Sequence, residues 1–340
     1  MIQGLSRRAR ALAGLWGLER ASLVAPRVDM LSRGFLSKRR RMYPFHAYPR
    51  DRFLSDWEVE LRFPAINPAF VKELLGNKLA FHLFLRDFGL DGHSCGLVGL
   101  LADGAFVPTE GAADLGEALQ RSRRLFLKPV SGGGGRRCRV VEDVGELPGE
   151  GLWLLEREGV PHPYASSIFP GALNTLRVLV LKDARGAFLA GAAHRFGASR
   201  EVPVDNFSRG GVACGVDPER GVLGRGVTEP GLYARDVHDR HPVTGKRLEG
   251  VRVPFWEDLK ELTVELTEAV PGLRYAGWDI FVSPEGPKVI EGNGDVANPN
   301  NLLQPHRPLL TCPRTVAFFR DHHVLSEGRA EALIRNLGAA

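Results

Sequence analysis

The apolar residues of this chain follow helical spacing in some stretches and strand-like runs in others, which predicts a mixed α+β protein. Residues 67–89 place apolar side chains at helical spacing, with Asn67 as the predicted N-cap and Pro68 at the first helical position. Gly76 interrupts this pattern, so Lys78 opens a second helix, which ends at Gly89. Further helices are predicted early in residues 1–60, at 256–270 and within 311–338, with loop in the later part of residues 1–60.

Runs of β-branched and aromatic residues predict strands at 125–129 and 138–142, on either side of the sequence SGGGGRR. Residues 152–158 are typical of a buried strand, and two more strands are predicted at 173–182 and 187–195. Segment 197–254 is rich in Gly, Pro, Asp, Arg and His. It is too long and irregular for a passive connection, so we expect a functional loop there.

Residues 275–293 predict a β-hairpin, because two strand-like runs flank the turn-forming cluster 284–287. A loop centred near Glu285 would set Asp279 opposite Glu291. Opposed residues of antiparallel strands share a face, and Asn293, two residues further on, shares it as well. Two carboxylates and an amide oxygen on one face are ligands that suit Mg²⁺.

A second interpretation of the hairpin is that Asp279 and Glu291 are ordinary solvated positions on the polar face of an edge hairpin. The flanking residues are apolar, however, and two opposed like charges would repel each other. A bound cation would relieve that repulsion. The pattern therefore favours a metal site.

Composition and length are those of a globular protein. The chain has 340 residues, of which 44% are hydrophobic and 25% charged, enough for two lobes or for one lobe with a sizeable subdomain. The apolar run 11–18 is too short for a bilayer span and lacks the features of a signal peptide. The four cysteines have neither metal-ligand spacing nor a disulfide pattern, which predicts a reduced, cytoplasmic protein.

Charge is spread unevenly. The whole chain carries +5 and its first 50 residues +9, which leaves −4 for the rest. The run 38–41 could contact an anionic membrane or nucleic acid, but a solvated arm packed on its own acidic body is the favoured interpretation. No nucleic-acid-binding motif accompanies the run, so no nucleic acid partner is expected. A weak peripheral membrane contact through this arm stays open, as does the oligomeric state.

The glycines of the SGGGGRR sequence follow a predicted strand that ends near Lys128. Consecutive glycines let backbone N–H groups approach an anion closely, and a neighbouring lysine supplies the compensating charge. A phosphate-binding loop is one interpretation, and an ordinary Gly-rich hairpin loop is the other. The sequence is neither a Walker loop nor a GxGxxG motif.

The order of these elements resembles that of the ATP-grasp superfamily: a lysine opening a helix, a lysine before a glycine loop, a strand ending in Glu, an arginine strand, and D-x(11)-E-x-N. More narrowly, NTLRV, DNFSRGG, HPVTGKRLEG, GWDIFV and IEGN resemble the sugar-transfer-associated ATP-grasp family, which is related to glutamate-ligase-like enzymes. The resemblance covers roughly residues 65–310. It implies two α+β lobes that grip ATP: residues 65–160 with the glycine-loop lid, and residues 161–340 with the metal-binding hairpin. Residues 1–64 would form a basic N-terminal extension of helical and irregular structure.

The resemblance also implies roles for individual residues. Nucleotide contacts fall on Lys78, Lys128, Ser131, Gly132, Gly133, Gly134 and Gly135, on the adenine-reading hinge Glu156, Arg157, Glu158 and Val160, and on His162 near the ribose. Catalytic roles fall on Arg177, Arg195 and Lys128, and magnesium ligation falls on Asp279, Glu291 and Asn293. Acceptor or phosphate contacts fall on Asn174, Asp205, Asn206, Arg209, His241 and Lys246. Residues 1–60 contain no clean substrate-binding domain, which leaves the acceptor open.

The resemblance implies a ligase that uses ATP with one or two Mg²⁺ ions, with Mn²⁺ as a substitute. In such ligases a substrate carboxylate attacks the terminal phosphate of ATP, and an amine captures the resulting acyl phosphate to form a carbon–nitrogen bond. The acceptor would be a small molecule or a sugar-linked acid. Two alternatives stay open: a phosphotransferase acting on a sugar or small-molecule hydroxyl, and a nucleotide-binding protein without catalysis.

Overall fold

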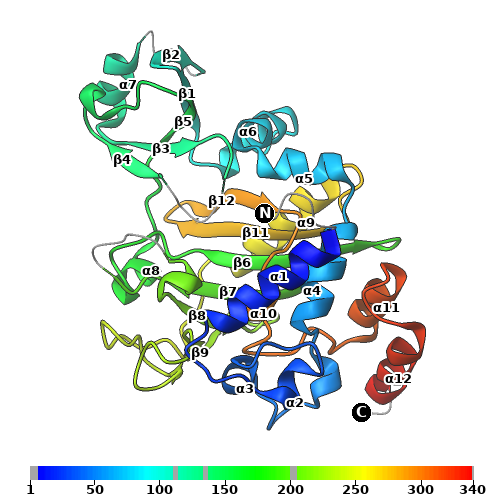
Figure 1. The fold of residues 1–340 in the computed structure, drawn as a ribbon. Helices are drawn as coiled ribbons and strands as arrows, with labels where there is room; N and C mark the ends of the chain where they lie inside the picture. The colour runs from blue at the N-terminus through cyan, green and yellow to red at the C-terminus, as the bar shows by residue number, and fades with distance from the viewer. Residues whose placement is uncertain (1–6, 110–113, 133–136, 200–204, 339–340) are drawn as a thin grey trace.

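The computed structural model describes residues 7–109, 114–132, 137–199 and 205–338. Its strands form two sheets, in which all the described pairings between named strands are antiparallel. A five-stranded sheet has the order β2-β1-β5-β3-β4, and a seven-stranded sheet has the order β10-β9-β8-β7-β6-β11-β12. Figure 1 shows the small sheet standing above the β12 edge of the large one. The predicted α+β class is confirmed.

The small sheet has its own apolar core. Its elements are β1 (Leu97–Ala102), β2 (Ala105–Pro108), β3 (Leu125–Pro129), β4 (Arg139–Val141) and β5 (Leu152–Arg157), with helix α7 (Leu115–Ser122) and the short helix η4 (Val144–Glu146). Leu119 on α7 packs with Leu101, Leu127 and Leu155 of the strands. The predicted strands at 125–129, 138–142 and 152–158 are thereby confirmed, with shorter ends for the last two.

The large sheet is buried on both faces. Its strands are β6 (Leu176–Asp183), β7 (Gly186–Phe196), β8 (Val212–Val216), β9 (Leu223–Val227), β10 (Val237–His238), β11 (Tyr275–Ser283) and β12 (Gly286–Asn293). Leu176, Val178 and Val180 of β6 point to one face, and Leu179 and Leu181 point to the other. All nine residues of β11 are buried, so β11 lies deep inside the sheet.

Different segments of the chain cover the two faces (Figure 1). The Val178 face packs against α5 (Ala69–Gly76), α6 (Lys78–Asp87) and α9 (Trp256–Ala269), with η3 (Asp91–His93) and α8 (Pro163–Ile168) beside them. The Leu179 face packs against residues 30–66 and the C-terminal region. Those helices are α2 (Val28–Leu31), α3 (Arg39–Met42), η1 (Arg50–Arg52), α4 (Asp56–Arg62), η2 (Phe63–Ala65), α10 (Pro299–Leu302), α11 (Pro313–Asp321) and α12 (Glu327–Gly338). The domain boundaries at 64 and 160 stay a prediction.

The expectation that segment 197–254 is irregular was wrong, because β8, β9 and β10 extend the large sheet there, after the short helix η5 (Phe207–Arg209). These strands have at most five residues each, and β8 and β9 contain glycines, which weakens the strand signal in the sequence. Close packing explains one glycine: a Cβ on Gly215 would lie 2.6 Å from the Cβ of His306.

Two helix starts also differ from expectation. Asn67 is not the N-cap of α5; its buried amide accepts from the Arg274 backbone N–H at 2.9 Å and donates to the Tyr275 and Gly294 carbonyls at 2.6 and 2.8 Å. Asn67 thus links the start of α5 to the first residue of β11 and to the residue that follows β12. The sequence analysis also missed α4, although Ser55 and Glu58 form a capping box, a pattern that marks a helix start.

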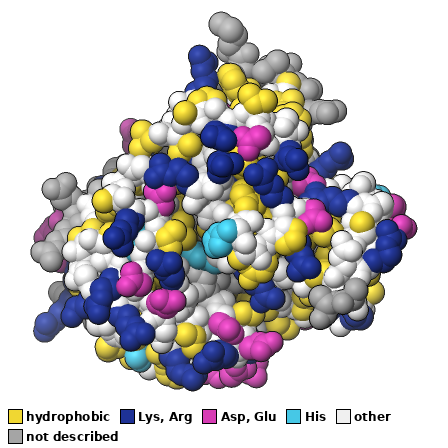
Figure 2. All heavy atoms as spheres, turned by 90° about the horizontal axis from the view of Figure 1, so that it is seen from below, with side chains coloured by type: hydrophobic (Ala, Val, Ile, Leu, Met, Phe, Trp, Pro, Cys, Tyr) yellow, Lys and Arg dark blue, Asp and Glu magenta, His cyan; other side chains and the backbone are white. Residues whose placement is uncertain are grey.

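The basic N-terminal arm packs on the rest of the protein through ion pairs, which agrees with the favoured interpretation of its sequence. Helix α1 (Arg7–Arg20) contacts α4, and the run 38–41 reaches acidic residues. Lys38 lies 2.6 Å from Glu229, and Arg41 lies 2.7 Å from Asp236. Figure 2 views the molecule from below, where α2 and α3 lie in Figure 1, and basic side chains there are interspersed with acidic ones. Within the described residues, no helix is long and apolar enough to span a bilayer.

We predict that acid destabilises the protein through His194. Burial lowers the pKa of His194 to about 3, and its neutral ring accepts from the Tyr164 hydroxyl at 2.6 Å. An unfolded histidine has a pKa of about 6.5, so the unfolded state binds the extra proton between pH 6.5 and 3. This stabilisation is complete above pH 6.5 and falls as the pH drops, by about 2 kcal/mol at pH 5.

Urea unfolding at pH 7 and pH 5 tests this prediction. The wild type should lose about 2 kcal/mol more than His194→Gln, because glutamine does not titrate. Equal losses in the two proteins would contradict the assignment to His194.

Candidate active site

The last three strands of the large sheet, β6, β11 and the edge strand β12, carry a row of charges, of which Arg177 and Asp279 are buried and Glu291 is half-buried. Arg177 on β6 pairs in register with Asp279 on β11, which pairs in register with Glu291 on β12. The predicted opposition of Asp279 and Glu291 is therefore confirmed. A β-bulge produces it: Ile280 pairs with Val289, so Ile290 is an extra residue that moves Glu291 into line.

Arg177 and Asp279 form a two-pronged ion pair. The Nε and Nη2 atoms of Arg177 donate to Oδ1 and Oδ2 of Asp279 at 2.6 and 2.9 Å, and Nη1 donates to the Ala297 carbonyl at 2.6 Å. Arg195 on β7 adds a contact from Nη2 to Oδ1 of Asp279 at 3.3 Å. Such charge-assisted, bidentate pairs fix geometry as well as charge. Asp279 is therefore held rigidly between two arginines.

The two carboxyl groups of the row have opposite pKa shifts. Burial would raise the pKa of Asp279, but Arg177 and Arg195 hold it below its usual value. Burial and the neighbouring charge of Asp279 raise the pKa of Glu291. Asp279 is thus the charged member of the pair, and Glu291 is the member that an added cation would help to ionise.

Lys78 and Lys128 lie next to this row, at the junction of the two sheets. The backbone N–H of Lys78 donates to the Val130 carbonyl at 2.9 Å, and its ammonium contacts the Gly132 carbonyl. The same ammonium lies 4.0 Å from Oε2 of Glu291. Burial lowers the pKa of Lys78, while Glu291 opposes that shift. The start of α6 and the end of β3 therefore bring both lysines toward the metal-ligand candidates.

Glu156 on β5 is the buried partner of Lys128, with 2.5 Å between Nζ and Oε1. The ring of His82 contacts the same carboxylate oxygen. Burial would raise the pKa of Glu156, but Lys128 and His82 hold it below its usual value. The sequence analysis did not name His82. Its position four residues after Lys78, on the same face of α6, is the signal that could have found it.

The hinge candidates follow Glu156 directly. Glu158 pairs with Arg124 at 3.1 Å, and Val160 is 62% exposed. The His162 ring accepts from the Tyr164 backbone N–H and caps α8, while the His162 N–H donates to the Val282 carbonyl at 2.7 Å. The structure thus sets the hinge against the large sheet. Arg157 ends β5 and is exposed.

The glycine loop is described in part. Ser131 forms an isolated bridge with Asn77, and Gly132 has a φ of +104°, which favours glycine. Gly133, Gly134 and Gly135 lie outside the described residues. The described end of the loop therefore starts beside Lys78.

The acceptor candidates divide into two groups. Oδ2 of Asp205 accepts from the backbone N–H and the hydroxyl of Thr175 at 2.5 and 2.6 Å, and that hydroxyl accepts from Nε of Arg195 at 3.0 Å. Asp205 is therefore connected to the charged row through Thr175. The structure brings no other acceptor candidate into a described contact with Arg195.

The remaining acceptor candidates have structural contacts or lie in solvent. Asn174 donates to the Phe169 carbonyl at 2.7 Å and accepts from the Gly197 N–H, while His241 contacts the Gly197 carbonyl at 2.7 Å. Asn206 caps η5, and Arg209 and Lys246 are exposed. We leave these residues out of the proposed site.

The donor set of the hairpin fits Mg²⁺. Within the described residues no group of three or more His, Cys, Asp and Glu side chains could hold a metal. Mg²⁺ does not need such a cage, since it binds through one or two carboxylates and completes its shell with water and phosphate oxygens. Asp279 and Glu291 supply two carboxylates, and the Asn293 amide donates through Nδ2 to the Gly277 carbonyl at 3.2 Å, which leaves its oxygen as the ligating atom.

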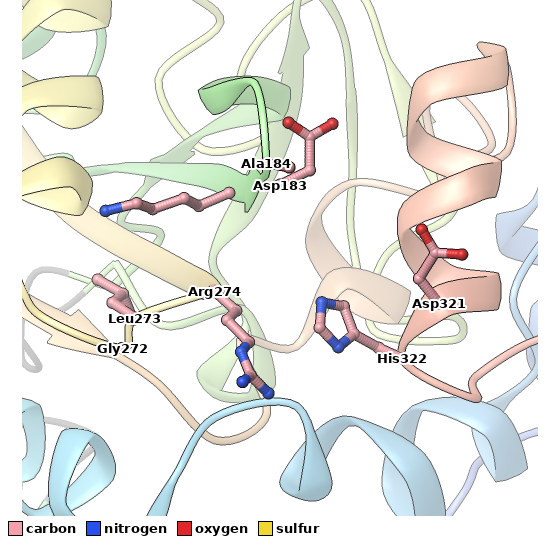
Figure 3. Close-up of a pocket in the computed structure, with 8 residues that line it drawn as sticks. Asp183, Ala184, Gly272, Leu273, Arg274, Asp321 and His322 are labelled. Carbon is pink, nitrogen blue, oxygen red and sulfur yellow. The ribbon is translucent and has the colours of Figure 1, made fainter.

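A cavity of about 520 Å³ opens elsewhere, at the far end of β6. Figure 3 shows its lining from the end of β6, the turn before β11 and the end of α11: Lys182, Asp183, Ala184, Gly272, Leu273, Arg274, Asp321 and His322. Lys182 is five residues beyond Arg177, or roughly 16 Å along the strand. Arg314 pairs with Asp183 at 2.7 Å. This cavity is separate from the candidate site.

A comparison with protein families matches the part of the chain that carries the charged row. The family model described as "Sugar-transfer associated ATP-grasp" matches residues 151–301, which include Arg177, Arg195, Asp279, Glu291 and Asn293. Over residues 151–301 the chain is therefore similar to the sugar-transfer associated ATP-grasp family. The resemblance identified from the sequence is confirmed. A comparison with curated proteins finds no match.

A comparison with solved structures finds matches of low sequence identity. D-alanine–D-alanine ligase from Bacillus anthracis has a TM-score of 0.41 and 12% identity, over 78% of this chain and 68% of that one. D-alanyl-alanine synthetase A from Vibrio cholerae has a TM-score of 0.43 and 10% identity, over 78% and 66%. N5-carboxyaminoimidazole ribonucleotide synthetase from Thermotoga maritima has a TM-score of 0.37 and 12% identity, over 66% and 44%, so the chain spans less than half of that protein.

We predict that Arg177→Met destabilises the fold by about 3 kcal/mol, because it leaves the buried Asp279 without its main partner. The double variant Arg177→Met, Asp279→Asn should lose less than the sum of the single losses, because it removes both charges. Denaturant unfolding measures both. Arg185→Met is the matched control: its contact with Asp183 is exposed, so it should cost less than about 0.5 kcal/mol. Additive losses in the double variant would contradict the coupling.

Proposed function

We propose that the protein is a Mg-ATP-dependent ligase that activates a substrate carboxylate as an acyl phosphate for capture by an amine. The observation that carries the proposal is the row of buried Arg177, buried Asp279 and half-buried Glu291, with Lys78 beside it. Phosphoryl transfer needs positioning and charge stabilisation more than a protein nucleophile. A row of fixed charges at the junction of two sheets suits that task.

Different residues of the site would bind different parts of Mg-ATP. Lys78, Lys128 and the described end of the glycine loop would bind the phosphates, and the hinge from Glu156 to Val160 would hold the adenine. Asp279, Glu291 and Asn293 would hold Mg²⁺, which when bound would offset the negative charge of the phosphates. Lys128 and Arg177 would offset the charge on the phosphoryl group in transfer.

Arg195 supports a carboxylate as the attacking group. Its guanidinium lies beside Asp279 and is held by Thr175, so in the proposed site it would present a fixed positive charge near the transferred phosphoryl group. An anionic carboxylate is attracted there and needs no base to remove a proton. Its oxygen would bond to the terminal phosphorus as the bond to ADP breaks. The amine would then attack the acyl carbon, lose a proton to water and release phosphate.

We expect acyl phosphate formation to be detectable with hydroxylamine, which captures acyl phosphates as hydroxamates. The protein would be incubated with ATP, Mg²⁺, hydroxylamine and a panel of amino acids and sugar acids, and ADP and hydroxamate would be measured. At least one acid should give both products in equal amounts. Asp279→Asn with Glu291→Gln should reduce this rate at least a thousandfold, because it removes the charges that hold the metal.

Phosphorus NMR of the same mixtures distinguishes the alternative. A phosphoester signal that forms with a hydroxyl-bearing acid, with no hydroxamate, would identify a phosphotransferase and overturn the ligase. An unchanged rate in the double variant would refute the metal assignment. The circular dichroism and unfolding transition of that variant serve as the folding control.

A further inference from the structure

His82 occupies a buried position between the two sheets. It lies on α6, one helical turn after Lys78, and its ring contacts Oε1 of Glu156 on β5. The same oxygen lies 2.5 Å from Nζ of Lys128 on β3. All three side chains are buried. One carboxylate oxygen therefore receives contacts from a residue of α6 and from a residue of the small sheet.

The three residues belong to different parts of the fold. Helix α6 packs on the large sheet, where Phe81 stacks near Trp278. Lys128 and Glu156 lie diagonally on neighbouring strands of the small sheet, since Phe126 pairs with Glu156 and Lys128 with Leu154. The contact of His82 with Glu156 thus connects the helices that cover the large sheet to the small sheet through side chains.

The charges explain why such a tie matters. Lys128 is buried, and a buried ammonium requires a fixed counter-charge. Glu156 supplies that charge, and a carboxylate contacted from two sides has less freedom to rotate than one contacted by a flexible lysine alone. His82 and Lys128 contact the same oxygen of Glu156, and each residue's described ion pair is with that carboxylate, so His82 would act on the ammonium through Glu156.

We propose that His82 is a positioning residue of the nucleotide site: it orients Glu156, and through Glu156 it holds the Lys128 ammonium where the phosphates of ATP bind. This inference rests on the proposed function. Replacing His82 leaves the positive charge of Lys128 in the site. It removes only the contact that orients Glu156. Its loss should therefore weaken ATP binding and raise KM for ATP, and it should also lower kcat, because Lys128 is proposed to offset charge on the phosphoryl group in transfer.

Calorimetric titration of ATP in the presence of Mg²⁺ tests the proposal. His82→Ala should weaken binding about tenfold, the usual effect of losing one hydrogen bond to a charged group. His82→Gln should restore most of the affinity, because its amide N–H can reach Glu156, whereas the shorter His82→Asn should not. His46→Ala, at an exposed histidine, is the matched control and should bind as the wild type does.

A double-variant cycle separates positioning from general structural damage. Lys128→Met weakens ATP binding by itself, and adding His82→Ala should cause no further loss if His82 acts through Lys128. Losses that multiply in the double variant, or equal affinity in His82→Ala and wild type, would overturn the role of His82 and leave the proposed function standing. A wild type that binds no ATP would overturn the proposed function, and the role of His82 with it.

Discussion

The bidentate ion pair of Arg177 and Asp279 is the interaction on which the centre of this structure depends. Two charges at the middle of a sheet buried on both faces are costly to desolvate, and good geometry with additional partners is what makes them tolerable. Arg195 and the Ala297 carbonyl supply those partners. The row ends at Glu291, whose pKa is raised by burial and by the neighbouring charge of Asp279.

The rest of the fold holds this row in place. Asn67 links the start of α5 to the backbone at both ends of the hairpin, and the bulge at Ile290 sets the register. Residues 30–66 cover the face of the sheet to which Arg177 points, with Tyr275 and Ala297 in the same core. The N-terminal segment, which the sequence presents as a basic arm, is thus part of the layer that buries the charges.

Features with a local cause could be predicted from the sequence. The hairpin follows from a turn cluster between two apolar runs, although its register at Asp279 and Glu291 also depends on the bulge at Ile290. Lys78 at a helix start follows from Gly76 and the Asn77 cap. Features that depend on distant contacts could not. The amide of Asn67 binds backbone more than 200 residues away, and β8, too short to signal a strand, is stabilised by its neighbours β7 and β9. His82 combines both kinds of feature. Its helical spacing from Lys78 could be read from the sequence, but its contact with Glu156 could not.

A crystal structure of the protein with Mg²⁺ and a non-hydrolysable ATP analogue tests the central claim most directly. The account predicts the phosphates between Lys78 and Lys128, the adenine against the hinge after Glu156, and Mg²⁺ on the carboxylates of Asp279 and Glu291. A nucleotide bound elsewhere, or a hairpin in which Asp279 keeps its contacts with Arg177 while no metal binds, would contradict it.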